Sequence, residues 1–162
     1  MVKYSEICED TLEYIRDKLR NDIYLCGTTL GLSGTSEARN HIFAGRPKDE
    51  RISPTSKPNF KLPRIVIDLI NNIRSKVGLN QDGFNDSQVD VQIASWISNS
   101  NWSAGLKVND RISYILENDS MPVEGGFARF EVTAGDVIDD PDREQTKMAT
   151  LQVKVLVFGG NT

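Results

Sequence analysis

The sequence is poor in the residues that most often bind metals or exchange protons near neutral pH. Its 162 residues include one histidine, His41, and two cysteines, Cys8 and Cys26. Two cysteines are too few for a disulfide scaffold, which favours a reducing compartment or indifference to redox conditions. A histidine without a second one or a cysteine pair nearby predicts a structural side chain rather than a metal ligand. We therefore expect no metal and no other cofactor.

Long apolar runs and surplus positive charge are also missing. No stretch approaches the roughly 20 apolar residues of a membrane helix, and Met1 to Asp10 has no apolar run typical of a secretory signal. We expect one domain, 1–162, made in a cytoplasm and without a membrane partner. A net charge of −4 argues against nonspecific DNA wrapping. An apolar content of 38% is somewhat low for a compact globule and suggests surface shared with partners.

The clearest pattern in the sequence runs from Ser87 to Leu116. Val89, Val91 and Ile93 alternate with polar residues, which predicts a strand with one buried face over 88–97. From Trp102 the apolar spacing becomes helical, and either Asn101 or Ser103 can cap the first turn of this helix. A strand followed by such a helix needs other strands to cover its apolar face.

Further elements complete a fold of the α+β class. The apolar spacing predicts an N-terminal helix over 4–23, with an apolar stripe that ends at Ile23. Alternating residues predict strands from 61 to about 77, over 127–134 and over 148–158, with polar loops at 118–126 and 134–145. We expect a mostly antiparallel sheet of four to five strands with two helices on one face.

The segment 24–62 is the least regular part of the sequence. Glycines and prolines punctuate it, and we interpret it as an extended arm that joins the helix 4–23 to the α+β core, 63–158. A short apolar patch predicts a strand near 41–45. The basic residues of the arm suggest that it orders against a neighbouring subunit, and the alternative is a surface loop.

Motifs that could support catalysis are incomplete. The run GTTLGLSGTSEAR has no lysine after its last glycine and no apolar strand before it, unlike a phosphate-binding loop. Gly31 to Thr35 lacks the closing glycine of a nucleophile elbow. An acidic run offers oxygen ligands for a hard cation, but Pro141 interrupts it and it has no central glycine, which favours a solvated hairpin tip. Its members are Asp136, Asp139, Asp140, Asp142 and Glu144.

Several stretches together resemble one family. In order they are the helix DTLEYIRDKLR, the step Gly45-Arg46-Pro47, the strand LPRIVIDLI, the strand VDVQIASWIS with Trp96, a helix ending in RISYIL, and the strand LQVKVLVF. This order resembles the tail terminator, or tail completion, proteins of long-tailed bacterial and archaeal viruses. The resemblance covers residues 4–24 and 60–158. The Gly- and Ser-rich stretch 27–40 departs from it.

The resemblance implies a structural subunit that is not an enzyme. Such subunits close into a homo-oligomeric ring, typically a hexamer, that caps the tail tube protein, stops its polymerisation and joins the head-tail connector or neck protein. It implies a place at the head-proximal end of the virion tail after assembly in the host cytoplasm, with genome DNA passing the lumen without specific binding. The arm and the tip 135–147 would then reach neighbours or the tube. The candidate interface residues are Arg46, Arg51, Phe60, Asp139, Asp140 and Arg143.

Three other hypotheses fit the sequence. The first is a neck or head-tail joining protein, because such proteins share small α+β folds and ring assembly. The second is a small binding module that recognises a partner through the arm 24–62. The third is an enzyme that uses the acidic run with Mg²⁺ or Ca²⁺, in which case Asp139 and Asp140 would be essential.

Overall fold

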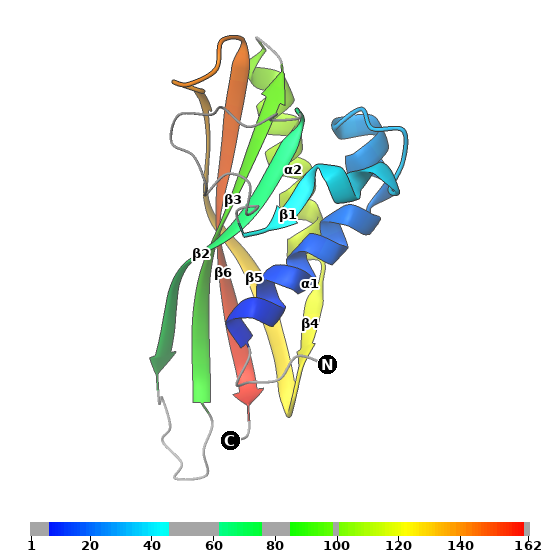
Figure 1. Ribbon diagram of the computed structural model, residues 1–162. Coiled ribbons are helices and arrows are strands. Elements are labelled where there is room, and N and C mark those ends of the chain that lie inside the picture. Colours follow the sequence, from blue (N-terminus) through cyan, green and yellow to red (C-terminus); the bar gives the residue numbers. More distant parts are fainter. Residues whose placement is uncertain (1–6, 46–61, 76–84, 99–100, 161–162) are drawn as a thin grey trace.

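The fold is a curved sheet with helices on one side. The computed structural model describes residues 7–45, 62–75, 85–98 and 101–160. Figure 1 shows the two longer helices on the same face of the sheet, which confirms the α+β class. The elements in chain order are α1 (Ile7–Asn21), η2 (Tyr24–Thr29), η3 (Glu37–Asn40), β1 (Ile42–Ala44), β2 (Arg64–Ser75), β3 (Asn85–Ser98), α2 (Trp102–Glu117), β4 (Ser120–Val123), β5 (Gly126–Asp139) and β6 (Thr146–Gly160).

In the described residues the sheet has six strands in the order β1-β2-β3-β6-β5-β4, so the expectation of four to five strands was too low. Only the β1–β2 pair is parallel among the pairings of the described strands. The strand missing from the sequence prediction is β4, which lies where a loop was expected. Pro122 lies inside it, and proline is tolerated there because β4 is an edge strand that pairs with β5 alone.

The core lies between the sheet and the two helices. Val89, Val91 and Ile93 of β3 are fully buried, as their alternation predicts. Val108 and Ile112 of α2 are fully buried in the same core cluster, and the Asn101 side chain caps the helix by accepting a hydrogen bond from the Ser103 N–H at 3.1 Å. The alternating apolar residues of β3 and the helically spaced apolar residues of α2 therefore contribute to one buried core, as expected from the sequence.

The end of α1 differs from the prediction. The helix ends at Asn21, and Ile23 is 80% exposed instead of continuing the buried stripe. The Asp22 carboxylate accepts a hydrogen bond from the Leu25 N–H at 2.6 Å, and the next turn, η2, is a π-helix. This turn rotates Ile23 outward and brings Leu25 and Cys26 into the core.

The first part of the expected extended arm is folded against the core. After η2, the short 3₁₀-helix η3 and the strand β1 bring the chain to β2, and Leu30, Leu32 and Ala38 are buried on the way. The strand predicted near 41–45 is confirmed as β1. Residues 46–61 of the arm lie outside the described part of the chain.

The tip between β5 and β6 is shorter than predicted. We expected a polar loop over 134–145, but β5 continues to Asp139. The Asp140 N–H then donates to the Thr146 carbonyl at 2.9 Å, and Gln145 adopts a positive φ of 54° to close the turn. These added strand residues lengthen the sheet at the end that carries the β5–β6 turn, at the top of Figure 1.

Candidate functional site

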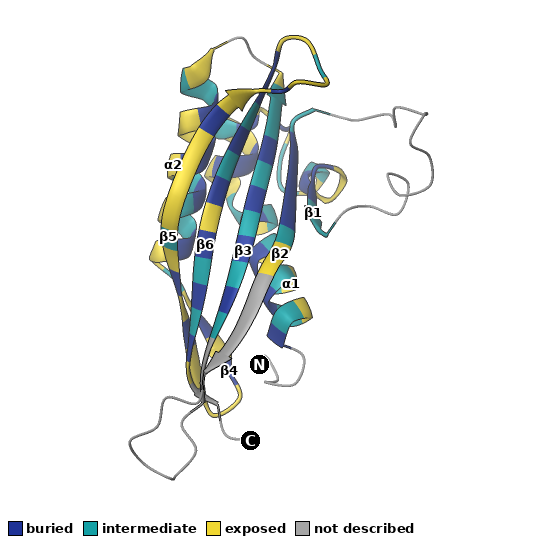
Figure 2. Ribbon diagram, turned by 90° about the vertical axis from the view of Figure 1, so that its left-hand side faces the viewer, coloured by how far each residue is buried: buried dark blue, intermediate teal, exposed yellow. Residues whose placement is uncertain are grey.

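The face of the sheet opposite the helices has no described element over it (Figure 2). Strand residues that alternate with the buried ones point to this open face, because successive side chains of a strand point to opposite sides. On β3 and β6 all of them whose burial is described are half-buried or exposed, except Thr146 at the start of β6, which is 4% exposed. They are Gln88, Asp90, Gln92, Ala94, Trp96 and Ser98 of β3, and Met148, Thr150, Gln152, Lys154, Leu156 and Phe158 of β6.

The open face is apolar at its two ends and polar in the middle. At one end the rings of Phe127 and Phe158 lie 5.3 Å apart, and these side chains are 44% and 37% exposed. At the other end Trp96, Met148 and Ile138 lie opposite one another on three adjacent strands. Aromatic residues and methionine are enriched in protein interfaces, so the ends suit contact with another protein.

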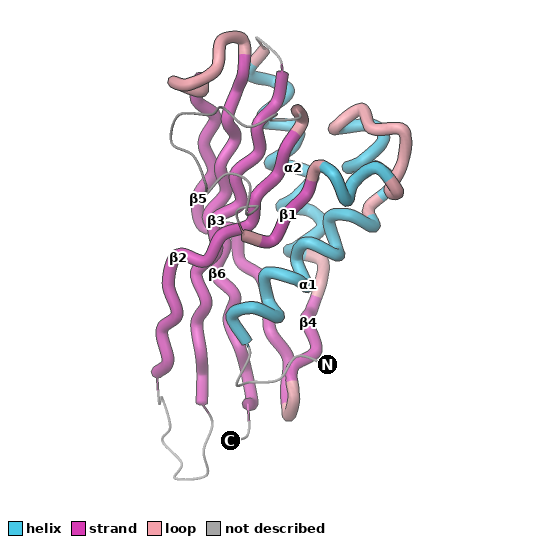
Figure 3. The backbone as a smooth tube through the Cα atoms, in the orientation of Figure 1, coloured by secondary structure: helices cyan, strands magenta, loops and turns pink. Residues whose placement is uncertain are grey.

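Two irregularities cross this face at the same level. The β2–β3 register shifts between Leu69 and Asn71, and the β5–β6 register shifts between Val132 and Ala134. Such bulges bend a strand and increase its twist, and β2 changes direction at this level in Figure 3. A hollow of about 160 Å³ opens there, lined by Ile70, Asp90, Val91, Thr133, Gln152, Val153 and Lys154.

On the helix side, the most organised cluster is built around Arg111 of α2. Its guanidinium forms two hydrogen bonds with the Asp22 carboxylate, at 3.0 and 2.8 Å, and lies 4.7 and 4.9 Å from the ring centroids of Tyr24 and Tyr114. Burial opposes ionisation of Asp22, but the hydrogen bonds from Arg111 and from the Leu25 N–H prevail and lower its pKa. The cluster therefore fastens the end of α1 to α2.

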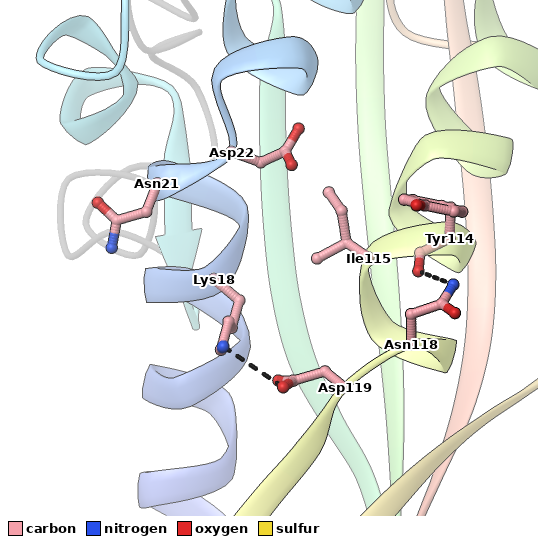
Figure 4. A pocket seen from close by; sticks show the side chains of 7 residues that line it. All are labelled: Lys18, Asn21, Asp22, Tyr114, Ile115, Asn118 and Asp119. Carbon is pink, nitrogen blue, oxygen red and sulfur yellow. Dashed lines mark hydrogen bonds and ion pairs between the residues drawn. The ribbon is translucent and has the colours of Figure 1, made fainter.

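A pocket of about 380 Å³ lies beside this cluster, between the C-terminal ends of α1 and α2 (Figure 4). Its charged groups are paired within the chain: Lys18 lies 3.4 Å from Asp119, and the Tyr14 hydroxyl donates to Asp119 at 2.7 Å. Burial and the neighbouring Asp119 raise the pKa of Tyr14. These interactions hold α1 against the start of β4.

A second groove of about 650 Å³ runs between η2 and α2. Its lining includes Tyr24 and Tyr114, which are 53% and 58% exposed, together with the exposed residues Thr28, Lys107 and Asp110. One of its two cations, Arg111, forms the ion pair with Asp22. The groove therefore shares Arg111, Tyr24 and Tyr114 with the cluster that joins the end of α1 to α2.

Three of the six candidate interface residues lie at the β5–β6 tip. Asp140 is buried, binds Arg143 at 2.9 Å and accepts a hydrogen bond from the Asp142 N–H at 3.0 Å, while Asp139 pairs with Lys147. Two central members of the acidic run, Asp139 and Asp140, therefore form ion pairs within the chain, and of these two acids only Asp139 is exposed. The other candidates, Arg46, Arg51 and Phe60, lie outside the described residues.

His41 has a structural environment, as its isolation in the sequence predicts. It is 5% exposed, its Nδ1 lies 2.6 Å from the Pro63 carbonyl oxygen, and its Nε2 lies 3.7 Å from Glu37. It connects η3 to the start of β2. Within the described ranges, no group of three or more His, Cys, Asp or Glu side chains could hold a metal ion, and no helix is long and apolar enough to cross a membrane.

Comparison with known proteins gives a likeness at the level of the fold. No protein-family model matches the chain, and no curated protein matches it. Among solved structures, the chain is similar to one described as the virion of a native gene transfer agent particle, with a TM-score of 0.56 and 12% sequence identity. The likeness covers 90% of this chain and 92% of that chain. The two chains therefore share a fold over nearly their whole length.

Proposed function

We propose that the protein is a structural virion subunit of the tail-terminator type. The observation that carries this proposal is the full-length fold likeness to a chain of a virion particle. The order of helix and strand motifs in the sequence independently resembles tail terminators. In this role, identical subunits form a ring, the ring caps the tail tube and ends its polymerisation, and the opposite side of the ring joins the head connector.

The surface of the subunit supports a role in assembly. The open sheet face has apolar ends with the exposed pair Phe127 and Phe158, and the helix side exposes Tyr24 and Tyr114. Exposed aromatic side chains are typical of residues that become buried against a protein partner. We propose that the subunit acts through such contacts and not through catalysis.

The ring is proposed to let genome DNA pass without holding it. The chain has a net charge of −4, and phosphate binding requires clustered cations. On the open face Lys154 lies between Asp90 and Glu131 on the adjacent strands, so its charge has acidic neighbours on both sides. DNA passage then needs no sequence-specific contact.

The test is to add the purified protein to polymerising tail-tube subunits of the virus or prophage that encodes it. Tail termination predicts rings bound at one tube end, seen by negative stain, and tubes that stop growing as protein is added. Unchanged tube growth without end-bound rings would contradict the proposal. Binding to the connector and not to the tube would favour a neck protein.

The metal-dependent enzyme is tested separately through the β5–β6 tip. We expect no rise in melting temperature with Mg²⁺ or Ca²⁺, because Asp139 and Asp140 already bind Lys147 and Arg143. A concentration-dependent rise that Asp139→Ala removes would support that alternative, and Glu131→Ala, an acidic residue elsewhere on β5, is the matched control.

A further inference from the structure

We propose that neighbouring subunits join by edge-to-edge strand pairing, with β5 of one copy beside β2 of the next. This inference rests on the proposed ring. The two end strands of the sheet are short: β1 pairs with β2 over Ile65–Ile67, and β4 pairs with β5 over Gly126–Arg129. In the described part of the chain no strand pairs with the outer edge of β2 from Leu69 onward, or with that of β5 from Phe130 onward.

The backbone of β5 presents hydrogen-bonding groups at its free edge. The Asp140 N–H donates to Thr146 across the β5–β6 turn, and backbone groups of an antiparallel strand alternate in direction. The N–H groups of Val137 and Asp139 therefore point away from β6. Consistent with this, the Val137 N–H donates to the carboxylate of Asp136 at 2.8 Å. Residues 133–136 are all exposed, which is the signature of an uncovered edge.

The backbone of β2 also presents hydrogen-bonding groups at its free edge, on the opposite side of the sheet from β5. The Ile65 N–H donates to His41 and the Ile67 carbonyl accepts from Gly45, each at 2.7 Å, so these residues face β1. By the same alternation, the backbone N–H and carbonyl groups of Leu69 face this edge of β2. Leu69 lies beyond the end of β1, where the described chain has no partner strand. Leu69 and Ile70 are 41% and 52% exposed, although they point to opposite faces of the sheet.

Each free edge carries one β-bulge but lacks two other common protections against pairing, lysine and proline. Soluble proteins often place lysine or proline on long edge strands, and the stretches 69–75 and 130–139 contain neither. The edges differ in charge: β5 has Glu131, Asp136 and Asp139, whereas Arg74 is the one charged residue of 69–75. Two β5 edges would bring acidic residues together, so a β5 edge favours a β2 edge.

The strand directions allow this pairing to repeat. Each neighbour in the series β2-β3-β6-β5 is antiparallel, so β5 of one copy and β2 of the next copy are antiparallel when the sheets continue side by side. Unlike surfaces that meet head to tail generate a ring when the rotation closes. The free stretches lie at opposite ends of the sheet, so the next copy is displaced along the strands, and a closed ring accommodates this displacement as strand tilt.

The test uses one substitution at each edge and native mass spectrometry over a concentration series. Ile70→Lys alters the β2 edge, and Ile138→Lys alters the upper end of β5, where Ile138 is 38% exposed. Because both side chains are exposed, the variants should fold like the wild type, which circular dichroism checks. Ile23→Lys is the matched control, since Ile23 is 80% exposed on the helix side.

Each edge variant alone is expected to lose the ring and to need at least tenfold more protein for any association. A mixture of the two variants is expected to give heterodimers and nothing larger, because one intact β5 edge and one intact β2 edge remain between the two chains. The control variant should form rings like the wild type.

Wild-type rings together with rings of both edge variants would overturn the edge-pairing inference and leave the proposed function standing. A mixture that stays monomeric or regains the ring would also overturn it, because the two edges would then not be complementary halves of one contact. A wild-type protein that forms no ring, alone or with tail-tube subunits, would overturn the proposed function and this inference together.

Discussion

The two faces of the sheet are built from the same strands but differ in burial and polarity. On β3 the helix-covered face consists of fully buried Val89, Val91 and Ile93, whereas the open face presents Asp90 and Gln92 between them. The covered face thus supplies the apolar burial that stabilises a single subunit. The open face, with its apolar ends and polar centre, contributes little to that burial and is not covered by any described element.

This comparison predicts that substitutions at adjacent residues of one strand have very different effects. The faces alternate with every residue, so one substitution on β3 falls in the buried core and the next falls on the open face.

The largest effect is expected from Ile93→Asp. It places an unpaired charge in the fully buried layer, which costs several kcal/mol, comparable to the whole stability of ~5–15 kcal/mol of a domain. Urea unfolding followed by circular dichroism should find little folded protein. The matched control is Gln92→Asp on the open face, with an expected loss of about 1 kcal/mol or less. Equal losses for the two variants would refute the assignment of the faces.

The next effect concerns the contact between α2 and β5. A Cβ atom at Gly105 would lie 2.7 Å from Cγ1 of Val137, which is too close, and a valine side chain has little freedom to move aside. We expect Gly105→Val to lower the free energy of unfolding by about 2–3 kcal/mol. Leu106→Val, at the neighbouring position that is 53% exposed, should change it by less than about 0.5 kcal/mol. Similar unfolding midpoints would contradict this packing.

A smaller and pH-dependent effect is expected from Asp22→Asn. The folded state lowers the pKa of Asp22 from its ordinary value of 3.8, so its ion pair stabilises the protein above that pH. The stabilisation, about 1 kcal/mol, should be lost as the pH falls through the lowered pKa. Urea titrations of wild type and variant should therefore differ at pH 7 and converge in strong acid.

The control for this pH dependence is Asp17→Asn. The Asp17 side chain is 58% exposed and its partner, Arg16, is a sequence neighbour, so we expect almost no change in stability at either pH. A difference between wild type and Asp22→Asn that persisted unchanged in strong acid would show that the Asp22 charge is not its cause.

The smallest effect is expected on the open face itself. Lys154 lies opposite Asp90 and Glu131 on its two neighbouring strands, and cross-strand charge pairs at a surface contribute well under about 1 kcal/mol. Lys154→Ala should therefore leave the thermal melting curve of the subunit nearly unchanged. A loss as large as that of Gly105→Val would mean that the open face is part of the stability core, against the comparison of the two faces.

Much of the fold follows from local sequence patterns. The alternation in β3 and β6, the helical spacing of α2 and its Asn101 cap, and the short strand β1 were all predictable because each depends on residues close in sequence. The apolar stripe of α1 was predicted well as far as Leu19, which is fully buried.

The rest depends on contacts that no short stretch reveals. Ile23 was misplaced because the turn that exposes it begins at Asp22, whose partner Arg111 lies 89 residues away. The strand β4 was missed because Pro122 weakens its pattern, and an edge strand tolerates proline only in a context that the sheet order supplies. The extension of β5 was missed because its acidic end resembles a loop until Lys147 and Arg143 are seen beside Asp139 and Asp140.

The candidate surfaces were less predictable than the fold. A candidate such as Asp140 was chosen for its charge, yet it is buried in an ion pair. The exposed pair Leu69 and Ile70 was not chosen, because two adjacent aliphatic residues of a strand are usually expected to have one buried member. Their exposure becomes evident only when the short length of β1 is known.

The proposed tail-terminator role requires that the subunits close into a ring. The most direct test is the absolute mass of the purified wild-type protein, measured by light scattering over a concentration series and with added tail-tube subunits, together with negative-stain images. The tail-terminator role predicts one closed ring of uniform size, alone or in the presence of tube subunits. A strict monomer that ignores tube subunits at every concentration would contradict it.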